Sequence, residues 1–517
     1  MERSNSSTPA GLDTFDHVVV LMLENRSFDN LLGYLYEDGV PAGKKFNGLQ
    51  TGTFKNPVPK RAKDYKNGLT IEVGRASDYH QPFPDPGEVY PHINTQLYNI
   101  IDKDNIGVEG EKMHPPYNVP YSPAHTNMEG FVNDYINVLQ ALGKQHPDDG
   151  KKYINPTIDL YKVIMQCFKP DQVNVLSSLA REFAVFDDWH CSVPSQTWCN
   201  RAFWHAATSG GKVVNPDPYN DPQSMVNWQN ANWYNPTIFD RLASKNLSAK
   251  IYSDNTASLT RMIHGYLHTP SSYSTDQFKI DIGGNDFPAY CFIEPVFMGV
   301  HNDQHPSSFD DPNYGKTTPG TVLLGEKLIW DVYTTIKQSK YRDKTLLIIT
   351  HDEHGGCYDH VSPLPAVRPD KSSGEMGFGF TRLGIRVPMV MVSAYIGKET
   401  IINDPYDHSS FIKTMSKKWQ FNTLTERDKK ANSFEAVFSG TKRTFPDIPA
   451  PVIKDFDEDA FLDRSLNDLQ RSILGGADHI ARINREGESS LKEFDASNIR
   501  TNRQALEYME RIKQYIL

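Results

Sequence analysis

The sequence predicts an α/β fold built around one central, mainly parallel sheet, and two observations lead to this prediction. Short apolar runs that end in polar residues recur along the chain, which is typical of parallel strands buried on both faces. Segments with helical periodicity lie between these runs. Alternation of strands and helices favours a parallel sheet covered by helices.

The expected elements follow one another in this order. The first strand is the run HVVVLML at residues 17–23. A helical pattern at 172–181 precedes the apolar run FAVF at 183–186. A second helical pattern at 237–245 precedes AKIY at 249–252. Each apolar run is short enough for a strand, and each helical pattern supplies a crossover between parallel strands.

The second half of the sheet is predicted in the same way. AYCFI at residues 289–293 is the fourth strand. The helical pattern at 325–339 leads into TLLIIT at 345–350, which is the clearest strand of the chain. VPMVMV at 387–392 is the sixth, and a helix at 409–418 follows it.

We predict one catalytic domain over residues 1–454 and a helical C-terminal extension over 455–517. Long irregular stretches rich in Gly, Pro and Asn interrupt the α/β pattern at about 39–123 and 213–235. Loops of this length in a compact domain are usually functional, so we expect lid-like insertions beside the site.

The composition excludes several classes of protein. Of the 517 residues, 38% are hydrophobic and 23% are charged, so the chain can bury a core and is not disordered. The formal charge of -10 and the lack of a long basic run argue against a nucleic-acid partner. None of the five cysteines has CxxC spacing, so we expect neither a disulfide framework nor a cysteine-ligated zinc site.

The hydropathy predicts no transmembrane segment and at most peripheral contact with a membrane. The mean hydropathy is -0.55, and the apolar run at 18–23 is too short to cross a bilayer. The first twelve residues contain no signal-peptide core. As written the chain is expected in the cytoplasm, and in the periplasm or outside the cell if a leader was removed. The oligomeric state is left open.

Acidic residues follow three of the predicted strands, where ligands of parallel sheets bind, and Asp187 and Asp188 follow the second of these strands. Glu24 follows the first strand, and Asp352 and Glu353 follow the fifth. Together these side chains would carry a formal charge of about -3, which needs protons or a cation when buried. Oxygen ligands suit Mg, Ca or Mn, and nearby histidines would admit Zn or Fe. The alternative is that these acids cap helices or lie in solvent.

Seven stretches, in order, resemble the bacterial and plant phosphoesterase family, which contains phospholipases C and acid phosphatases of the A type. They are residues 19–30, 128–132, 191–201, 237–240, 292–295, 347–356 with 358–361, and 406–409. The resemblance implies a three-layer, alkaline-phosphatase-like α/β fold and a phosphoric-ester hydrolase with a divalent metal ion at the strand ends.

The resemblance also implies roles for single residues. Thr197, in the stretch SQTWCNR at 195–201, falls on the position of the nucleophile. The metal ligands would be Glu24, Asp352, Glu353 and the Thr197 hydroxyl, with Asn25 next to the phosphate. Metal coordination lowers the pKa of a hydroxyl, so that it can attack phosphorus and form a phosphothreonine intermediate.

The charge on the transferred phosphate needs hydrogen-bond donors. The candidates are Asn25, His92, Arg201 and His305, with His301 as a weaker one. A loop histidine is more often a surface residue, and Arg201 could equally be structural. His354 and His360 are expected to orient the acidic ligands.

Two departures from the family pattern guide the choice of substrate. Ser195 and Cys199 stand where phospholipases C have Gly and Pro, which favours a phosphomonoesterase of the acid-phosphatase type. A phospholipase C acting on phospholipid head groups is the alternative. A binding protein for phosphate esters without turnover is a further one, although Thr197 and the acidic ligands are all present.

Overall fold

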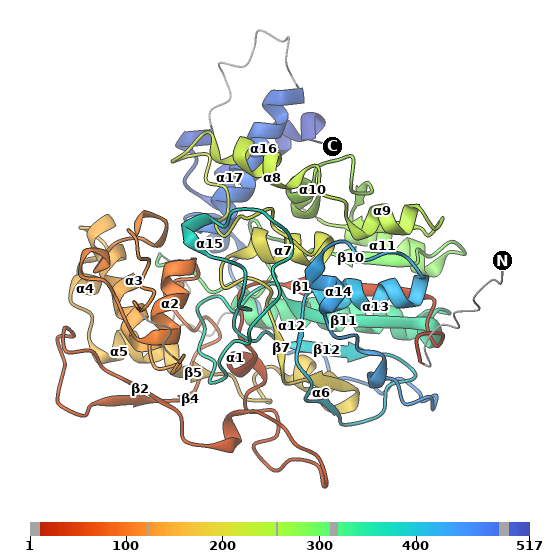
Figure 1. Cartoon of the computed structure of the whole chain (residues 1–517), viewed down its shortest axis with the longest axis horizontal. Coiled ribbons are helices and arrows are strands. Elements are labelled where there is room, and N and C mark those ends of the chain that lie inside the picture. Colours follow the sequence, from red (N-terminus) through yellow and green to blue (C-terminus); the bar gives the residue numbers. More distant parts are fainter. Residues whose placement is uncertain (1–10, 122–124, 255–256, 311–318, 485–495, 517) are drawn as a thin grey trace.

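The computed structural model describes residues 11–121, 125–254, 257–310, 319–484 and 496–516. Its centre is an eight-stranded sheet (Figure 1). In spatial order the strands are β13 (Thr400–Ile402), β6 (Ala184–Phe186), β12 (Met389–Val392), β11 (Thr345–His351), β1 (His17–Leu23), β10 (Tyr290–Ile293), β8 (Ala249–Tyr252) and β9 (Ser272–Tyr273).

The predicted α/β fold is confirmed, and so is the mainly parallel character of its sheet. Strand β12 runs antiparallel to both β11 and β6, and the other neighbouring strands are parallel. All six expected strands form. The short edge strands β9 and β13 were not expected from the sequence.

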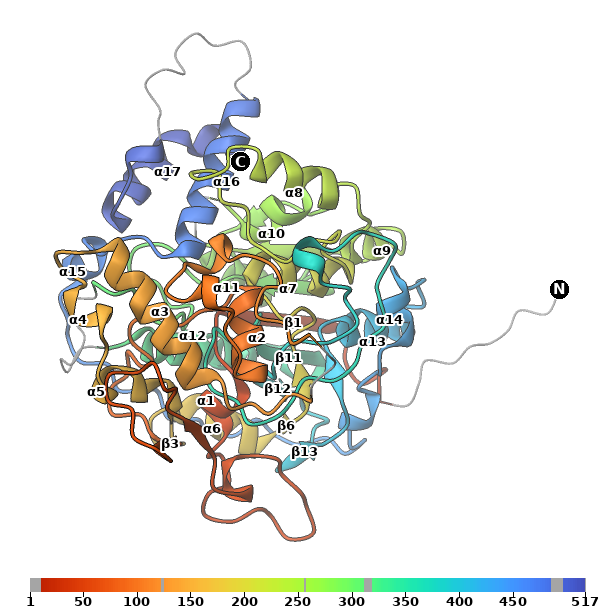
Figure 2. The same ribbon diagram turned by 60° about the vertical axis from the view of Figure 1, so that its left-hand side comes forward.

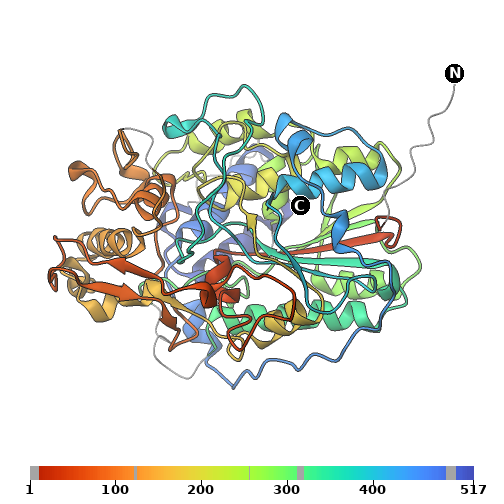
Figure 3. The ribbon, with the colours of Figure 1, turned by 60° about the horizontal axis from the view of Figure 1, so that its bottom comes forward.

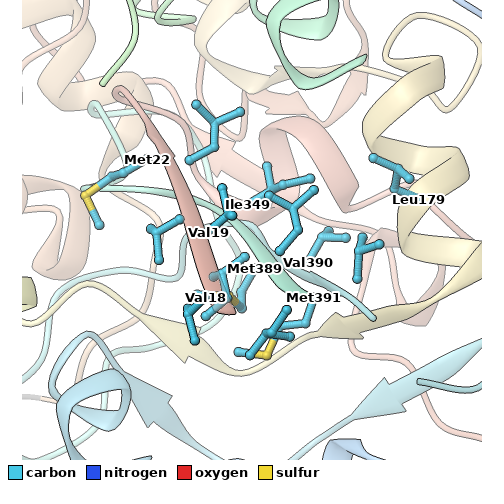
Figure 4. Close-up of a cluster of buried hydrophobic side chains, with 14 of the residues drawn as sticks. Val18, Val19, Met22, Leu179, Ile349, Met389, Val390 and Met391 are labelled. Carbon is cyan, nitrogen blue, oxygen red and sulfur yellow. The ribbon is translucent and has the colours of Figure 1, made fainter. Parts of the chain in front are cut away.

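The apolar runs form central strands because both faces of the sheet are covered. Every residue of β11 is buried, as are six of the seven residues of β1. Figure 4 shows Val18, Val19 and Met22 of β1 in one cluster with Ile349, with the labelled residues of β12 and with Leu179 of helix α6 (Asn174–Glu182). Burial of one such aliphatic side chain contributes about 1.5–3 kcal/mol.

Helices cover the sheet on both sides, which gives the three layers that were predicted. Helices α6 and α12 (Thr321–Gln338) pack together on one face, and α7 (Thr197–Ala206) and α13 (Ser409–Trp419) pack together on the other (Figure 3). The smaller elements around this body are α1 (Phe28–Leu32), α9 (Ile238–Ala243), α10 (Leu259–His264), α11 (Thr275–Gly283), α14 (Glu426–Lys430), β7 (Trp189–His190) and β14 (Tyr406–Asp407).

The first insertion, predicted at 39–123, folds together with residues 125–167 into a lobe beside the sheet, seen in orange in Figures 1 and 2. The lobe has a hydrophobic cluster of its own. It is built from β2 (Lys55–Pro57), β3 (Thr70–Glu72), β4 (Gly74–Arg75), α2 (Tyr90–Tyr98), α3 (Phe131–Gln145), α4 (Lys151–Ile154), α5 (Ile158–Tyr161) and β5 (Gln166–Cys167). Helix α2 carries the loop before it to the edge of the sheet, where it meets the site described below.

The C-terminal segment is helical and packs against the body of the protein. It contains α15 (Glu458–Leu462), α16 (Asp468–Asn484) and α17 (Asn502–Ile516). Helix α16 lies near α10 and α8 (Ser224–Asn232) (Figure 1) and shares a hydrophobic cluster with Trp198 of α7. All five cysteines are buried and unbridged. Within the described ranges no helix is both long and apolar enough to cross a membrane.

Candidate active site

The predicted acidic residues meet where β1 and β11 end. Glu24 directly follows β1, and Asp352 and Glu353 directly follow β11. The backbone N–H of Asp352 donates to the Leu23 carbonyl (3.1 Å), and the N–H of Asn25 donates to Asp352 Oδ1 (3.1 Å). The three acidic side chains are fully buried. The parallel pairing of the two strands therefore holds them side by side.

Helix α7 adds a hydroxyl and a guanidinium to the same cluster. Thr197 is its first residue, and Thr197 Oγ1 donates a hydrogen bond to Glu24 Oε2 (2.9 Å). One turn later, Arg201 donates through Nε to Glu24 Oε1 (2.9 Å) and through Nη2 to the Met22 carbonyl (2.9 Å). Residues four apart share one face of a helix, so α7 presents both groups to Glu24.

The cluster is strongly anionic for a buried site. Burial raises the pKa of Glu24 well above its ordinary value, although Arg201 opposes the shift. Burial, followed by the charge of Asp352, does the same to the pKa of Glu353. Asp352 Oδ2 and Glu353 Oε1 have no hydrogen-bond partner among the described residues. Such bare, buried carboxylate oxygens fit a divalent cation, because an ion supplies the missing counter-charge.

Two compact groups of potential metal ligands occur in the described part of the chain. Each contains three side chains whose ligand atoms all lie within 4.8 Å of one another: Asp85, Glu88 and His305, and Asp29, Asp359 and His360. Neither group contains Glu24, Asp352 or Glu353, so that ligand set stays a prediction.

Glu88 is a residue of the site that the sequence analysis missed. It follows the loop at residues 84–87, and its carboxylate accepts hydrogen bonds from Asn25 Nδ2 and from Gln196 Nε2 (3.2 Å). Burial and the charge of Glu353 raise the pKa of Glu88 well above its ordinary value. A Cβ at Gly87 would lie 2.4 Å from the His92 ring, so the turn before Glu88 requires glycine. The Asp-Pro-Gly-Glu turn was visible in the sequence, but its distance from any strand hid its role.

Asn25 faces this carboxylate because its backbone is left-handed, with φ at 55°. Its carbonyl lies against Gly355, where a Cβ would come within 2.2 Å of Asn25 O. Asn25 Oδ1 is buried and has no partner in the described ranges. The amide therefore lies between Glu88 and the strand-end carboxylates.

The three histidine candidates are buried rather than exposed in loops. His305 lies near Glu88, with Nε2 4.0 Å from Glu88 Oε2. His301 Nδ1 lies 2.8 Å from Asp303 Oδ1. The Asp303 carbonyl accepts the N–H of Glu24 (2.7 Å), so His301 contacts the site through this aspartate.

His92 is linked to the site by a chain of hydrogen bonds. His92 Nδ1 lies 2.7 Å from Asp134 Oδ1, and the charge of Asp134 raises the pKa of His92 against the effect of burial. Gln96 Nε2 donates to Asp134 Oδ2 (2.9 Å), and Gln96 Oε1 lies 2.8 Å from His354 Nε2. His354 Nδ1 is 3.2 Å from Glu353 Oε2. The Nδ1 atom has no hydrogen-bond partner among the described residues, and burial lowers the pKa of His354 to about 3, so His354 lies beside Glu353 without the orienting hydrogen bond that was expected.

An arginine pairs with both aspartates of the second compact group, which we call the Arg386 cluster. It consists of Asp29, Asp359, His360 and Arg386. Arg386 donates through Nε to Asp359 Oδ1 (3.0 Å) and through Nη2 to Asp29 Oδ1 (3.0 Å). His360 Nδ1 lies 2.6 Å from Asp29 Oδ2, and its Nε2 lies 3.0 Å from Asn47 Oδ1. His360 thus orients Asp29, and not one of the acidic residues predicted to bind metal.

Other polar residues near the motifs serve the fold. Asp187, at the end of β6, accepts the Asn47 N–H (2.7 Å) and the Asn403 amide (2.7 Å), away from the strand-end carboxylates of β1 and β11. Arg26 donates to the carbonyls of Gln304 (2.7 Å) and Gln81 (2.6 Å), as expected for a structural arginine.

The family profile and the sequence relatives agree with the motif analysis. The sequence profile of the Phosphoesterase family matches residues 15–422. Non-specific phospholipase C6 of Arabidopsis thaliana is 33% identical over 454 residues, which are 84% of this chain and 74% of the relative. Phospholipase C A of Mycobacterium tuberculosis is 23% identical over 78% of this chain and 73% of the relative. A solved structure from the alkaline phosphatase superfamily of Vibrio parahaemolyticus is 11% identical, with a TM-score of 0.32, over 50% of this chain and 64% of that one.

Proposed function

The chain belongs to the phosphoesterase family and is a phosphoric-ester hydrolase, and from this premise we propose that it hydrolyses phosphodiesters of phospholipid head groups with Thr197 as the nucleophile. The observation that supports the nucleophile is the hydrogen bond from Thr197 Oγ1 to Glu24 Oε2 (2.9 Å). A hydroxyl needs a neighbouring base to become a good nucleophile, and this carboxylate is within reach of its proton.

The reaction would proceed in two balanced steps. Thr197 Oγ1 forms a bond to phosphorus while the bond to the lipid alcohol breaks. The threonine proton passes to Glu24, which later returns it to solvent, and the departing lipid oxygen takes up a proton from solvent. Water then cleaves the phosphothreonine bond, releases the phosphorylated head group and restores the hydroxyl. Arg201 holds Glu24 in place through its hydrogen bond to Oε1 (2.9 Å), and Asn25 offers an amide to the phosphate.

A divalent cation at this site would be held by Glu24, Asp352, Glu353 and Thr197. The unpartnered oxygens of Asp352 and Glu353 fit such an ion. When bound, the cation would lower the pKa of the Thr197 hydroxyl and offset the charge of the phosphate. The oxygen donors alone do not choose between Mg, Ca, Mn, Zn and Fe.

Two observations support a diester over a monoester. The relatives reported above are phospholipases C. The site is also lined by buried carboxylates, which disfavour the second negative charge of a monoester more than the single charge of a diester. Ser195 and Cys199 weigh little against this, because Ser195 Oγ donates to the Val213 carbonyl and Cys199 lies in a hydrophobic cluster.

A phosphomonoesterase is the second candidate, because Ser195 and Cys199 depart from the phospholipase pattern. The two candidate functions are distinguished by kcat/KM on phosphatidylcholine vesicles, bis-nitrophenyl phosphate and nitrophenyl phosphate, each measured before and after chelation. We expect lipid and diester to exceed monoester by at least about tenfold, which corresponds to about 1.4 kcal/mol in transition-state binding. Faster monoester turnover would make the second candidate the function. No turnover of any ester would contradict both.

A further inference from the structure

We propose that Asp85, Glu88 and His305 form a second divalent-cation site beside the predicted one. Their ligand atoms lie within 4.8 Å of one another. Ligands on one cation, at about 2.1 Å each, lie at most about 4.2 Å apart, so no pair in the group has to approach by more than about 0.6 Å. The existence of this site does not depend on the ester that is hydrolysed.

The tautomer of His305 prepares it as a ligand. His305 Nδ1 lies 2.9 Å from the Pro306 carbonyl, and a carbonyl only accepts hydrogen bonds, so Nδ1 carries the proton. The Nε2 atom then carries no proton, and its lone pair can bind a metal ion. A metal-binding histidine commonly donates its other N–H to a backbone carbonyl in this way.

The lone pair of His305 is buried without a donor. The residue is 1% exposed, and its Nε2 has no hydrogen-bond partner in the described ranges. Glu88 Oε2, which is itself an acceptor, lies 4.0 Å from Nε2, and Asp85 Oδ2 lies 3.7 Å from Nδ1. Two facing acceptors in a buried site are unfavourable unless a cation or a proton lies between them.

The carboxylate of Glu88 is also arranged as an acceptor. Asn25 Nδ2 and Gln196 Nε2 each donate to one of its oxygens. Of the described lysines and arginines, none forms an ion pair with Asp85 or Glu88; their paired partner is His305. Arg26 lies close enough to influence Asp85, but its Nε and Nη1 donate to backbone carbonyls and to Asn30, and its Nη2 has no hydrogen-bond partner among the described residues.

The charge of the whole cluster calls for more than one divalent ion. Its five buried or largely buried carboxylates are Glu24, Asp85, Glu88, Asp352 and Glu353. Arg201 offsets one negative charge through Glu24. Arg26 and Asp303, at the edge of the cluster, carry opposite charges and cancel. Two divalent cations would neutralise the remaining four carboxylates.

The imidazole ligand selects the class of cation. Nitrogen together with carboxylate oxygen suits Mn, Zn or Fe better than Ca or Mg. Glu88 also contacts Asn25, which is expected next to the phosphate. A cation on Glu88 would therefore lie close enough to take part in phosphate binding.

The test is the number of Mn²⁺ ions bound by the full chain after chelator treatment and dialysis, measured by elemental analysis and by the spin coupling of paired Mn²⁺ ions. We expect two ions per chain in the wild type. Glu88→Gln and His305→Gln should each retain one, and Asp352→Asn should lose the other ion. None of these readouts requires turnover, so failure of the proposed function is distinguished from failure of this site.

His360→Gln is the matched control, because it changes a histidine of the Arg386 cluster, where an arginine already supplies the counter-charge. It should still bind two ions. A wild type with one ion would overturn the proposal, as would two ions in both the Glu88 and the His305 variants. Loss of an ion only in the His360 variant, or loss of both ions in Glu88→Gln while the apo variants show cooperative thermal unfolding, would also overturn it.

Discussion

Two buried carboxylate clusters each take acidic residues from the segments that follow β1 and β11, yet their charges are balanced in different ways. In the Arg386 cluster, one guanidinium bonds both aspartates, and His360 uses both ring nitrogens. In the active-site cluster, which comprises Glu24, Asp85, Glu88, Asp352, Glu353 and His305, several acceptor atoms are bare.

The difference separates structural from functional use of the same side chains. A buried acid that is paired by the chain itself holds the fold together. A buried acid that is left unpaired costs folding free energy, and this cost is offset only when something from outside binds. Residue type alone does not separate the two cases, because both clusters contain carboxylates and histidine.

The largest expected effect is on catalysis and comes from the hydroxyl of the active-site cluster. Thr197→Ala should lower kcat at least about 10³-fold, because it removes the nucleophile. The matched change is Ser27→Ala beside the Arg386 cluster, where Ser27 caps helix α1. This variant should keep near-normal kcat and lose about 1 kcal/mol of stability. Comparable kcat in the two variants would remove Thr197 from the mechanism.

The next effect is on stability and comes from the arginine. Arg386→Met should lower the free energy of unfolding by about 3–5 kcal/mol, because it leaves two buried aspartates without their partner. Arg382→Met is the control, since Arg382 is only partly buried and bonds Tyr98 Oη (2.6 Å) and Asn94 Oδ1 (3.1 Å). Urea unfolding of both variants gives the comparison. If the Arg386 variant lost no more stability than the control, that arginine would not close the cluster.

In the metal-free protein, replacing one carboxylate by its neutral amide should change the free energy of unfolding in opposite directions in the two clusters. At pH 8 both Glu353 and Asp29 are ionised in the unfolded chain. Burial and Asp352 raise the pKa of Glu353, so folding must bury its charge or take up a proton, and Glu353→Gln should stabilise by about 1–2 kcal/mol.

Asp29 should respond in the opposite direction. Burial raises its pKa, but His360 and Arg386 outweigh burial and hold the pKa below its ordinary value. Its ionised form therefore stabilises the fold above the unfolded pKa, and Asp29→Asn should cost about 2 kcal/mol. Urea midpoints with chelator present measure both variants. A shift of the same sign in both would mean that the clusters do not differ in charge balance.

Most of the sheet could be predicted because its central strands are buried on both faces. The runs at 17–23 and 345–350 are apolar almost throughout, and they became β1 and β11. Strand β13 is only half-buried, and β9 has two residues, so neither leaves an apolar run in the sequence. The direction of β12 was also hidden, since a fully buried strand reads alike in parallel and antiparallel pairs.

The site was predictable only where a strand carried it. Glu24, Asp352 and Glu353 stand directly after strands, so the sheet geometry places them together. Glu88 comes from the lobe formed by the first insertion, and its position depends on how α2 docks against the sheet. His360 is the opposite case. It stands in a recognisable motif, but its contact with Asp29 depends on how distant segments pack, and the sequence did not predict that contact.

The smallest expected effect concerns a buried histidine that belongs to neither cluster. His264 of α10 lies beside His205 of α7, with ring centroids 5.5 Å apart, and no described carboxylate forms an ion pair with it. Burial, followed by the charge of His268, lowers the pKa of His264 to about 3. Its folded pKa lies below its unfolded value, so stability is present above about pH 6.5 and is lost as the pH falls toward 3. At pH 5.5, one unit below the unfolded pKa, the loss is about 1.4 kcal/mol.

His264→Phe should lose that much less stability than the wild type between pH 7.5 and pH 5.5, as measured by urea unfolding at both values. The exposed His125→Gln should behave like the wild type. Equal acid lability in all three proteins would show that His264 does not contribute to the acid response.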